Sequence, residues 1–173
     1  MIWEFSVNQA NESDVTIGLT NPKSPSNVGA VMRAAGCYQV NSVYYTGQRY
    51  ARAAKFNTDT KQVSERIPLI GTESFLNEIS HEKKLVCIEL AEGAQPLPEF
   101  SHPENALYVF GPEDGSIDQK IVDKAYAVVY IPTIGCMNLA ATVNVVLYDR
   151  LAKSANYQAN DELIIQSRDT NNT

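Results

Sequence analysis

Short, nearly continuous apolar segments recur along this chain and alternate with helical patterns. β-Branched and aromatic residues fill runs at 15–19, 42–46, 67–70, 85–90, 106–110 and 127–131, and helical patterns occur near 26–38, 73–79, 117–124 and 139–151. Apolar runs of this length are typical of strands buried on both faces of a parallel sheet. The sequence therefore predicts an α/β fold, a mainly parallel sheet with helices on both faces.

One stretch, residues 130–151, combines a strand end, a loop and an apolar helix. Pro132 stops the strand because proline has no backbone N–H for the ladder. Apolar residues then recur at helical spacing, and Asn138 is available as the helix cap: Leu139, Val143, Val146, Leu147 and Leu151. Loops at the carboxyl ends of buried strands bind ligands in open α/β sheets. An ordinary core strand and helix is the alternative.

The length of 173 residues is enough for one domain with a sizeable core. We assign 1–157 to that domain and expect 158–173 to be a polar, frayed tail. No apolar run is long enough to cross a membrane, and the first ten residues contain Glu4, Asn8 and Gln9 rather than a signal pattern. A cytoplasmic location is expected.

The cysteines and histidines give no metal or disulfide pattern. The three cysteines, Cys37, Cys87 and Cys136, are widely spaced, and two of them lie in apolar surroundings typical of a core. His81 and His102 are far apart in the sequence, so each is expected to be a surface or loop residue. No metal site is predicted.

The charge distribution is uneven. The chain carries a net charge of −6, which by itself argues against a nucleic-acid partner. Residues 23–66, however, contain seven basic and two acidic residues, among which Lys23, Arg49, Arg52 and Lys55 are the candidate nucleic-acid contacts. A local basic patch acts despite the total charge because distant exposed charges are screened. A solvated loop face explains the charges equally well.

Three polar islands follow predicted strands. They are Asn27 to Gly29 with Arg33, the turn from Gly111 to Gly115, and the loop from Cys136 to Leu139. Each has a structural explanation when taken singly: a helix start, an exposed arginine, a type I turn or a helix cap. Neither a Gly-x-Gly-x-x-Gly pattern after the first strand nor a phosphate-binding P-loop occurs, which disfavours a generic nucleotide-binding enzyme.

Taken together and in order, the islands resemble the three motifs of the SpoU (TrmH-like) class of the SPOUT superfamily. The matching patterns are Asn27-x-Gly29-x-x-x-Arg33-x-Ala35, Phe110-Gly111-x-Glu113-x-x-Ser116-Ile117, and Ile131-Pro132 with Asn138-Leu139. The resemblance covers roughly residues 15–153. The class consists of RNA 2′-O-ribose methyltransferases that use S-adenosylmethionine, and the chain is similar to its minimal members, several of which modify tRNA.

The resemblance implies features that periodicity does not reveal. It implies a deep trefoil knot near the carboxyl terminus, although knots are very rare in proteins. It also implies a homodimer in which both subunits complete the site. On this reading the cofactor is held by residues of the knotted loops, with Leu90, Gly111, Ile131, Cys136, Leu139 and Ala140 as the expected contacts.

The proposed reaction needs a ribose hydroxyl held in line with the methyl group of the cofactor. The family resemblance makes Arg33 the catalytic candidate. Because a guanidinium stays protonated, we favour a positional role in which it holds the adjacent phosphate; proton abstraction by Arg33 requires greatly lowered basicity. Asn27 and Asn138 are expected to orient Arg33, the ribose or the cofactor, and Glu113 to anchor the arginine or the loop.

Three positions depart from the family pattern. Thr133 replaces the usual methionine, and Cys136 and Ala140 replace serines of the third motif. Two lost hydroxyls affect fine positioning, whereas the four main polar residues remain. Cys136 has no neighbouring base in the sequence, so we interpret it as a replacement for the family's serine rather than as a nucleophile. The alternative function is a catalytically weak RNA-binding or assembly protein that keeps the knotted fold.

Overall fold

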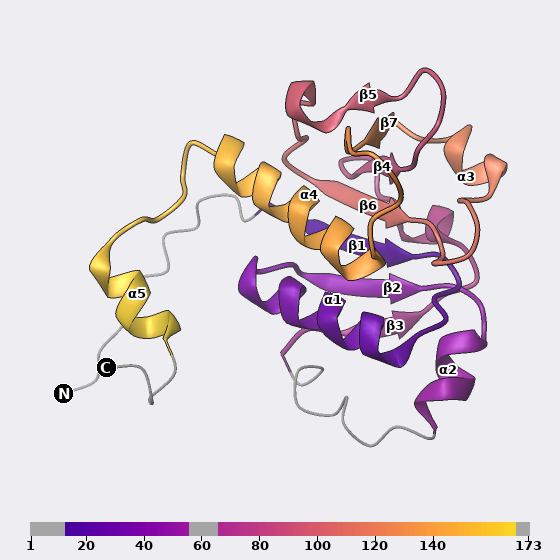
Figure 1. The fold of residues 1–173 in the computed structure, drawn as a ribbon, viewed down its shortest axis with the longest axis horizontal. Helices are drawn as coiled ribbons and strands as arrows, with labels where there is room; N and C mark the ends of the chain where they lie inside the picture. The colour runs from indigo at the N-terminus through magenta and orange to yellow at the C-terminus, as the bar shows by residue number, and fades with distance from the viewer. Residues whose placement is uncertain (1–12, 56–65, 169–173) are drawn as a thin grey trace.

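The computed structural model describes residues 13–55 and 66–168. Within these residues the chain forms a seven-stranded sheet in the order β3-β2-β1-β6-β4-β7-β5, and every strand pair is parallel (Figure 1). The strands are β1 (Val15–Leu19), β2 (Ser42–Tyr45), β3 (Leu69–Gly71), β4 (Lys84–Ile88), β5 (Gln95–Pro96), β6 (Ala106–Phe110) and β7 (Ala127–Tyr130). The predicted α/β class and parallel sheet are confirmed.

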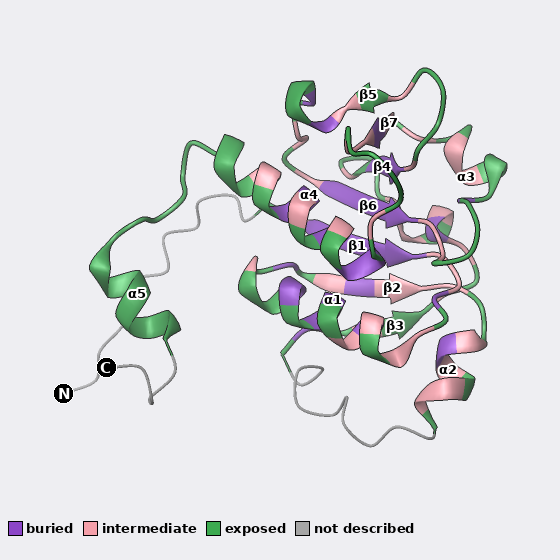
Figure 2. Cartoon of the chain, in the orientation of Figure 1, coloured by how far each residue is buried: buried purple, intermediate pink, exposed green. Residues whose placement is uncertain are grey.

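Both faces of the sheet are covered, which gives two apolar cores (Figure 2). Helices α1 (Pro25–Cys37) and α4 (Leu139–Lys153) pack against each other over one face. The second core includes Phe75 of the 3₁₀ turn η1 (Phe75–Glu78) and Ile121 of α3 (Gln119–Val122). This arrangement follows from strand residues that are apolar on both faces.

Successive side chains of a central strand point to opposite faces of the sheet, so each strand contributes to both cores. In β4, Val86 and Ile88 belong to the core beneath α1 and α4, whereas Leu85 and Cys87 belong to the other core. Gly18 of β1 lies where a side chain would collide with the core, since a Cβ there would stand 2.9 Å from the Phe75 ring. Glycine at this position lets the aromatic ring pack directly on the strand.

The two long helices begin at residues suited to capping. The Ser24 hydroxyl accepts from the backbone N–H of Asn27, and Pro25 opens α1. The Asn138 side chain accepts from the backbone N–H groups of Ala140 and Ala141 at the start of α4. The predicted Asn138 cap is confirmed, and the two caps fix where the helices start relative to the strand ends.

The far half of α4 is held by a group of polar side chains, here called the basal network: His102, Tyr108, Asp149, Arg150 and Lys153. The His102 imidazole lies 2.7 Å from the Tyr108 hydroxyl and 2.8 Å from Asp149, which also pairs with Lys153 at 2.7 Å. Arg150 and Lys153 donate to four backbone carbonyl groups of the preceding loop, at Leu97, Phe100, Pro103 and Glu104. The network fastens α4 to residues 97–104.

Several local predictions need correction. The helices expected at 73–79 and 117–124 shorten to η1 and α3, while helix α2 (Arg49–Ala54) follows β2, in a stretch whose sequence carries a weak helical signal. Strand β5 and the 3₁₀ turn η2 (Leu97–Glu99) occupy a segment predicted to be loop. Strand β5 has only two residues, Gln95 and Pro96, which are too few to show the alternation of a strand.

Single-residue predictions also change. Cys87 is buried, but Cys37 and Cys136 are exposed, so only one cysteine belongs to the core. His102 lies in a loop as expected, yet its side chain is only 5% exposed because it joins the basal network. The burial of His102 could not be predicted from local sequence, because its partner Asp149 lies 47 residues further along the chain.

The segment expected to be a frayed tail contains a helix as far as the structure describes it. Helix α5 (Asp161–Ser167) begins at Asn160, whose side chain accepts from the N–H of Leu163, and all of its residues are exposed. Residues 169–173 lie outside the described residues. No helix of the described chain is long and apolar enough to cross a membrane. The trefoil knot stays a prediction.

Candidate functional site

A cavity opens at the carboxyl ends of β4, β6 and β7, where the second and third polar islands meet. Its walls comprise strand ends and the loops that follow them: Ile88, Glu89, Leu90, Phe110, Gly111, Pro112, Glu113, Gly115, Tyr130, Ile131, Thr133, Gly135, Cys136, Met137, Leu139 and Thr142. Five residues expected to bind cofactor line it, namely Leu90, Gly111, Ile131, Cys136 and Leu139. Ala140 is buried in α4 and is not part of its lining.

Next to the cavity, three motif side chains form a directed hydrogen-bonded chain, here called the motif network: Asn27, Glu113 and Asn138. The Asn138 amide donates to Oδ1 of Asn27 at 3.1 Å, and the Asn27 amide donates to Oε1 of Glu113 at 3.1 Å. Asn138 uses its own oxygen for the N–H groups of α4. The three residues are far apart in sequence, so the fold alone brings the motifs together.

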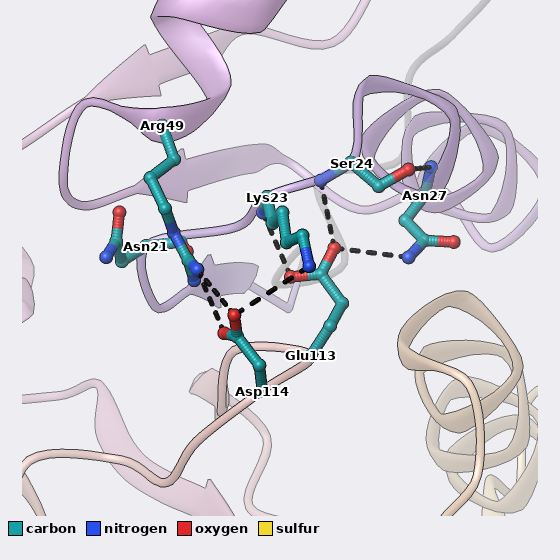
Figure 3. Close-up of polar contacts among 7 residues, drawn as sticks. All are labelled: Asn21, Lys23, Ser24, Asn27, Arg49, Glu113 and Asp114. Atoms are coloured by element: carbon teal, nitrogen blue, oxygen red, sulfur yellow. Dashed lines mark hydrogen bonds and ion pairs between the residues drawn. The ribbon is translucent and has the colours of Figure 1, made fainter.

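Glu113 is the acceptor at the end of this chain. It also accepts from the backbone N–H groups of Lys23 at 2.9 Å and Ser24 at 3.1 Å, which ties its loop to the segment before α1 (Figure 3). Burial opposes ionisation of Glu113, but these backbone and Asn27 hydrogen bonds outweigh it and lower the pKa of the carboxyl group. Glu113 therefore stands as a carboxylate at neutral pH and anchors the loop.

The neighbouring Asp114 makes a second link across the same loops (Figure 3). Both of its oxygens accept from Nη1 of Arg49, at 2.8 and 2.9 Å, and Arg49 also donates to the carbonyl oxygen of Asn21. The Arg49 hydrogen bond lowers the pKa of Asp114, and Asp114 in turn raises the pKa of Arg49. Arg49, predicted to contact RNA, is thus already neutralised within the chain.

The other predicted basic residues are exposed or lie away from the motif network. Arg33 is exposed on α1, and no side chain in the described ranges forms a hydrogen bond or ion pair with it. Glu113 and the two asparagines therefore do not orient Arg33 within this chain. Arg52 donates to Gln48 at 2.8 Å, Lys23 lies 4.0 Å from Asp114, and Lys55 is exposed.

Glu89 is a cavity residue that the sequence argument missed. Its carboxylate accepts from the backbone N–H of Leu90 at 3.1 Å and of Ile117 at 2.9 Å. It thus links the end of β4 to the loop that carries Glu113. The available signal was a lone glutamate at the end of an otherwise apolar run, where a buried strand normally has no charge.

The lining chemistry fits S-adenosylmethionine. Apolar side chains from the strand ends, including Leu90, Ile131 and Leu139, suit a neutral adenine ring, while Glu89 and Glu113 suit a cation. In the part of the chain that the structure describes, no group of three or more His, Cys, Asp or Glu side chains is placed to hold a metal ion. The donor set of the cavity is that of an organic cofactor site.

Comparisons with known proteins agree with this geometry. The model of the SpoU rRNA Methylase family matches residues 14–148. That range contains β1 through most of α4, and thus all three motifs and the cavity. No curated protein matches the sequence.

Solved structures share the fold at low sequence identity. An rRNA methyltransferase from Sinorhizobium meliloti aligns with a TM-score of 0.69 and 19% identity over 82% of this chain and 56% of its own. The SpoU methyltransferase AviRb from Streptomyces viridochromogenes, in complex with the cofactor AdoMet, aligns at 0.67 and 17% over 80% and 57%.

A third structure has a more similar length. It concerns the 2-OH methylation of C/U34 on tRNA and aligns with a TM-score of 0.62 and 21% identity over 80% of this chain and 95% of its own. By contrast, the chain spans only 56% and 57% of the first two structures. At these identities the likeness establishes the fold.

Proposed function

The chain belongs to the SpoU rRNA Methylase family, and we propose that it is an S-adenosylmethionine-dependent RNA methyltransferase that modifies a ribose 2′-hydroxyl, with tRNA as the substrate. The observation that carries this proposal is the motif network beside the cavity. Asn27, Glu113 and Asn138, from three separate motifs, are joined by hydrogen bonds at the edge of a pocket whose lining suits the cofactor. A purely structural role would not require the polar network and the cavity to coincide.

When bound in this cavity, S-adenosylmethionine supplies a methyl group made electrophilic by its sulfonium sulfur. The cofactor would supply its methyl group to the ribose oxygen, with the carbon–sulfur bonding pair kept by sulfur, and the hydroxyl proton would pass to solvent water. The protein contributes by holding the hydroxyl in line and excluding competing geometries. Backbone groups at Gly111 and Gly135 and the side chains of Leu90, Ile131 and Leu139, which line the cavity, would hold the cofactor.

Arg33 supplies the positive charge for the substrate. Its guanidinium remains protonated, so it holds the phosphate next to the target ribose and polarises the hydroxyl rather than removing the proton. Its exposed position, without an ion-pair partner among the described residues, suits a group reserved for a ligand.

A homodimer completes the site in this proposal. Arg33 forms no hydrogen bond or ion pair with the motif network of its own chain, and in this proposal a second copy brings it to a cofactor cavity. The exposed Tyr148 and Leu151 on α4, 61% and 41% accessible, provide apolar surface for such a contact. The deep knot and a cytoplasmic location belong to the same proposal.

Lys23, Arg52 and Lys55 are the proposed phosphate contacts of the bound RNA. They lie in the basic region before and after β2. Arg49, in the same region, is paired with Asp114 and is therefore not counted among them. Phosphate contacts make binding fall steeply with salt, because counterions are released. RNA affinity that does not change with salt would contradict this part of the proposal.

Mass mapping of ribose methylation in RNA from cells with and without the gene tests the proposed reaction. Loss of a single 2′-O-methyl group from tRNA is the expected result. No lost methyl group would leave the alternative, a catalytically weak RNA-binding protein, which the replacement of two motif serines by Cys136 and Ala140 favours. Calorimetry with S-adenosylmethionine separates the two, since the alternative predicts no detectable binding.

A further inference from the structure

The charged residues in the cavity wall are acidic. Among the described residues that line it, Glu89 and Glu113 are acidic and none is a lysine, arginine or histidine. Lys23 and Arg49 stand close by but pair with Asp114. The groups that bond to the two glutamates are backbone N–H groups and one amide, and none of these neutralises a carboxylate. Beside Glu89, a ligand in this cavity therefore meets a carboxylate to which no described lysine, arginine or histidine is bonded.

The two carboxylates are not equivalent. Glu113 accepts three hydrogen bonds from the segment before α1 and from α1, so it is committed to joining loops. Glu89 accepts two, one on each oxygen, whereas an ionised carboxylate offers about four acceptor positions. Glu89 keeps acceptor capacity and remains partly accessible at the cavity wall.

Glu89 also stands beside the backbone expected to hold the cofactor. A Cβ placed on Gly111 would lie 3.5 Å from Oε2 of Glu89. The carboxylate is held there by backbone groups at the end of β4 and at Ile117, so its charge has a fixed position. A fixed charge in a partly desolvated site acts on a ligand more strongly than a mobile surface charge.

The cofactor and its product differ by one charge at the reacting sulfur. S-adenosylmethionine carries a sulfonium cation, whereas S-adenosylhomocysteine has a neutral thioether and is otherwise alike. We propose that Glu89 is a specificity-determining residue that favours the sulfonium cofactor over the thioether product. This inference rests on the proposed function. Its consequence is that the product binds less tightly once the positive charge is lost, which promotes exchange for fresh cofactor.

Titration calorimetry of the full-length chain with each of the two ligands tests this inference. For Glu89→Gln we expect Kd for S-adenosylmethionine to rise about fivefold and Kd for S-adenosylhomocysteine to change less than about twofold. The ratio of the two constants is the decisive quantity, because a shifted loop weakens both ligands together. Glu92→Gln is the matched control: it removes the same charge from an exposed position outside the cavity lining and should leave the ratio unchanged.

Two outcomes would overturn the inference. Parallel loss of affinity for both ligands in Glu89→Gln would show that Glu89 only anchors the loop. Unchanged affinity for both ligands would show that the charge of Glu89 does not act on the cofactor. Both leave the proposed function intact. Failure of the unsubstituted chain to bind either ligand would instead overturn the proposed function and the inference with it.

Discussion

The two ends of helix α4 carry polar networks of opposite character. At its start, the motif network of Asn27, Glu113 and Asn138 is partly exposed and borders a cavity. Toward its end, the basal network surrounds His102 and Tyr108, whose side chains are almost completely buried, and its cations reach several backbone carbonyl groups. A buried network that is fully paired stabilises one structure. A partly exposed network that borders a cavity leaves room for a ligand.

Substitution of Arg33 gives the largest expected effect on function. It tests whether residues of the sequence motifs serve catalysis rather than stability. Arg33→Ala should lower methyl transfer at least about a hundredfold, the scale typical of removing a transition-state contact. Because no described side chain pairs with Arg33, the free energy of unfolding should stay within about 0.5 kcal/mol of wild type. Single-turnover rates and urea unfolding measure the two quantities. Near wild-type transfer would make Arg33 structural.

Asp149 gives the largest expected effect on stability. Asp149→Ala removes the partner of both His102 and Lys153, and we expect the free energy of unfolding to fall by about 2–3 kcal/mol. Urea unfolding measures this, and cofactor affinity measured well below the transition should be unchanged. If Asp149→Ala lowered the affinity for cofactor and left the free energy of unfolding unchanged, the basal network would contribute to cofactor binding rather than to stability.

Lys55 has no ion-pair partner among the described residues, whereas Arg49 is paired with Asp114, so the two cations can be compared. Lys55→Gln should lower RNA affinity several-fold and reduce the slope of log K against log salt by about one. Arg49→Gln should change the slope less, since Asp114 already neutralises Arg49. Filter binding across a salt series tests both variants. Equal slopes in the two variants would mean that RNA displaces Asp114.

His102 gives the smallest effect, a pH dependence of stability. Burial lowers the pKa of His102 below its ordinary value of 6.5, against the opposing effect of Asp149. The unfolded chain then binds more protons than the folded one, so stability falls as the pH drops below 6.5. Urea unfolding between pH 7.5 and 5.5 should show this slope in wild type and a flatter one in His102→Gln. The same slope in both would exclude His102 as its source.

The sequence predicted the part of the fold that depends on apolar periodicity. The central strands at 15–19 and 106–110 and the two capped helices were located closely, because strand runs and Asn138 or Ser24 caps are local signals. Strand β5 and the one-turn elements were missed or misjudged. Strand β5 is held by its pairing with β7 rather than by a strand pattern of its own two residues.

The site was predictable to the level of the motifs but not of their contacts. Five of six expected cofactor residues line one cavity. The pairing of Arg49 with Asp114, the role of Glu89 and the burial of His102 all depend on partners 28 to 65 residues away, which no local pattern reveals. Arg33 was placed on the correct helix, but the absence of a hydrogen bond or ion pair between it and Glu113 was not foreseen.

Titration of S-adenosylmethionine into the full-length chain tests most directly whether the motif end of α4 is a cofactor site. The unsubstituted chain should bind one cofactor per chain. Thr142→Trp, which fills the cavity beside Leu139, should abolish binding, and Asp149→Ala at the other end of α4 should retain it. No binding by the unsubstituted chain, or undiminished binding by Thr142→Trp, would contradict the assignment.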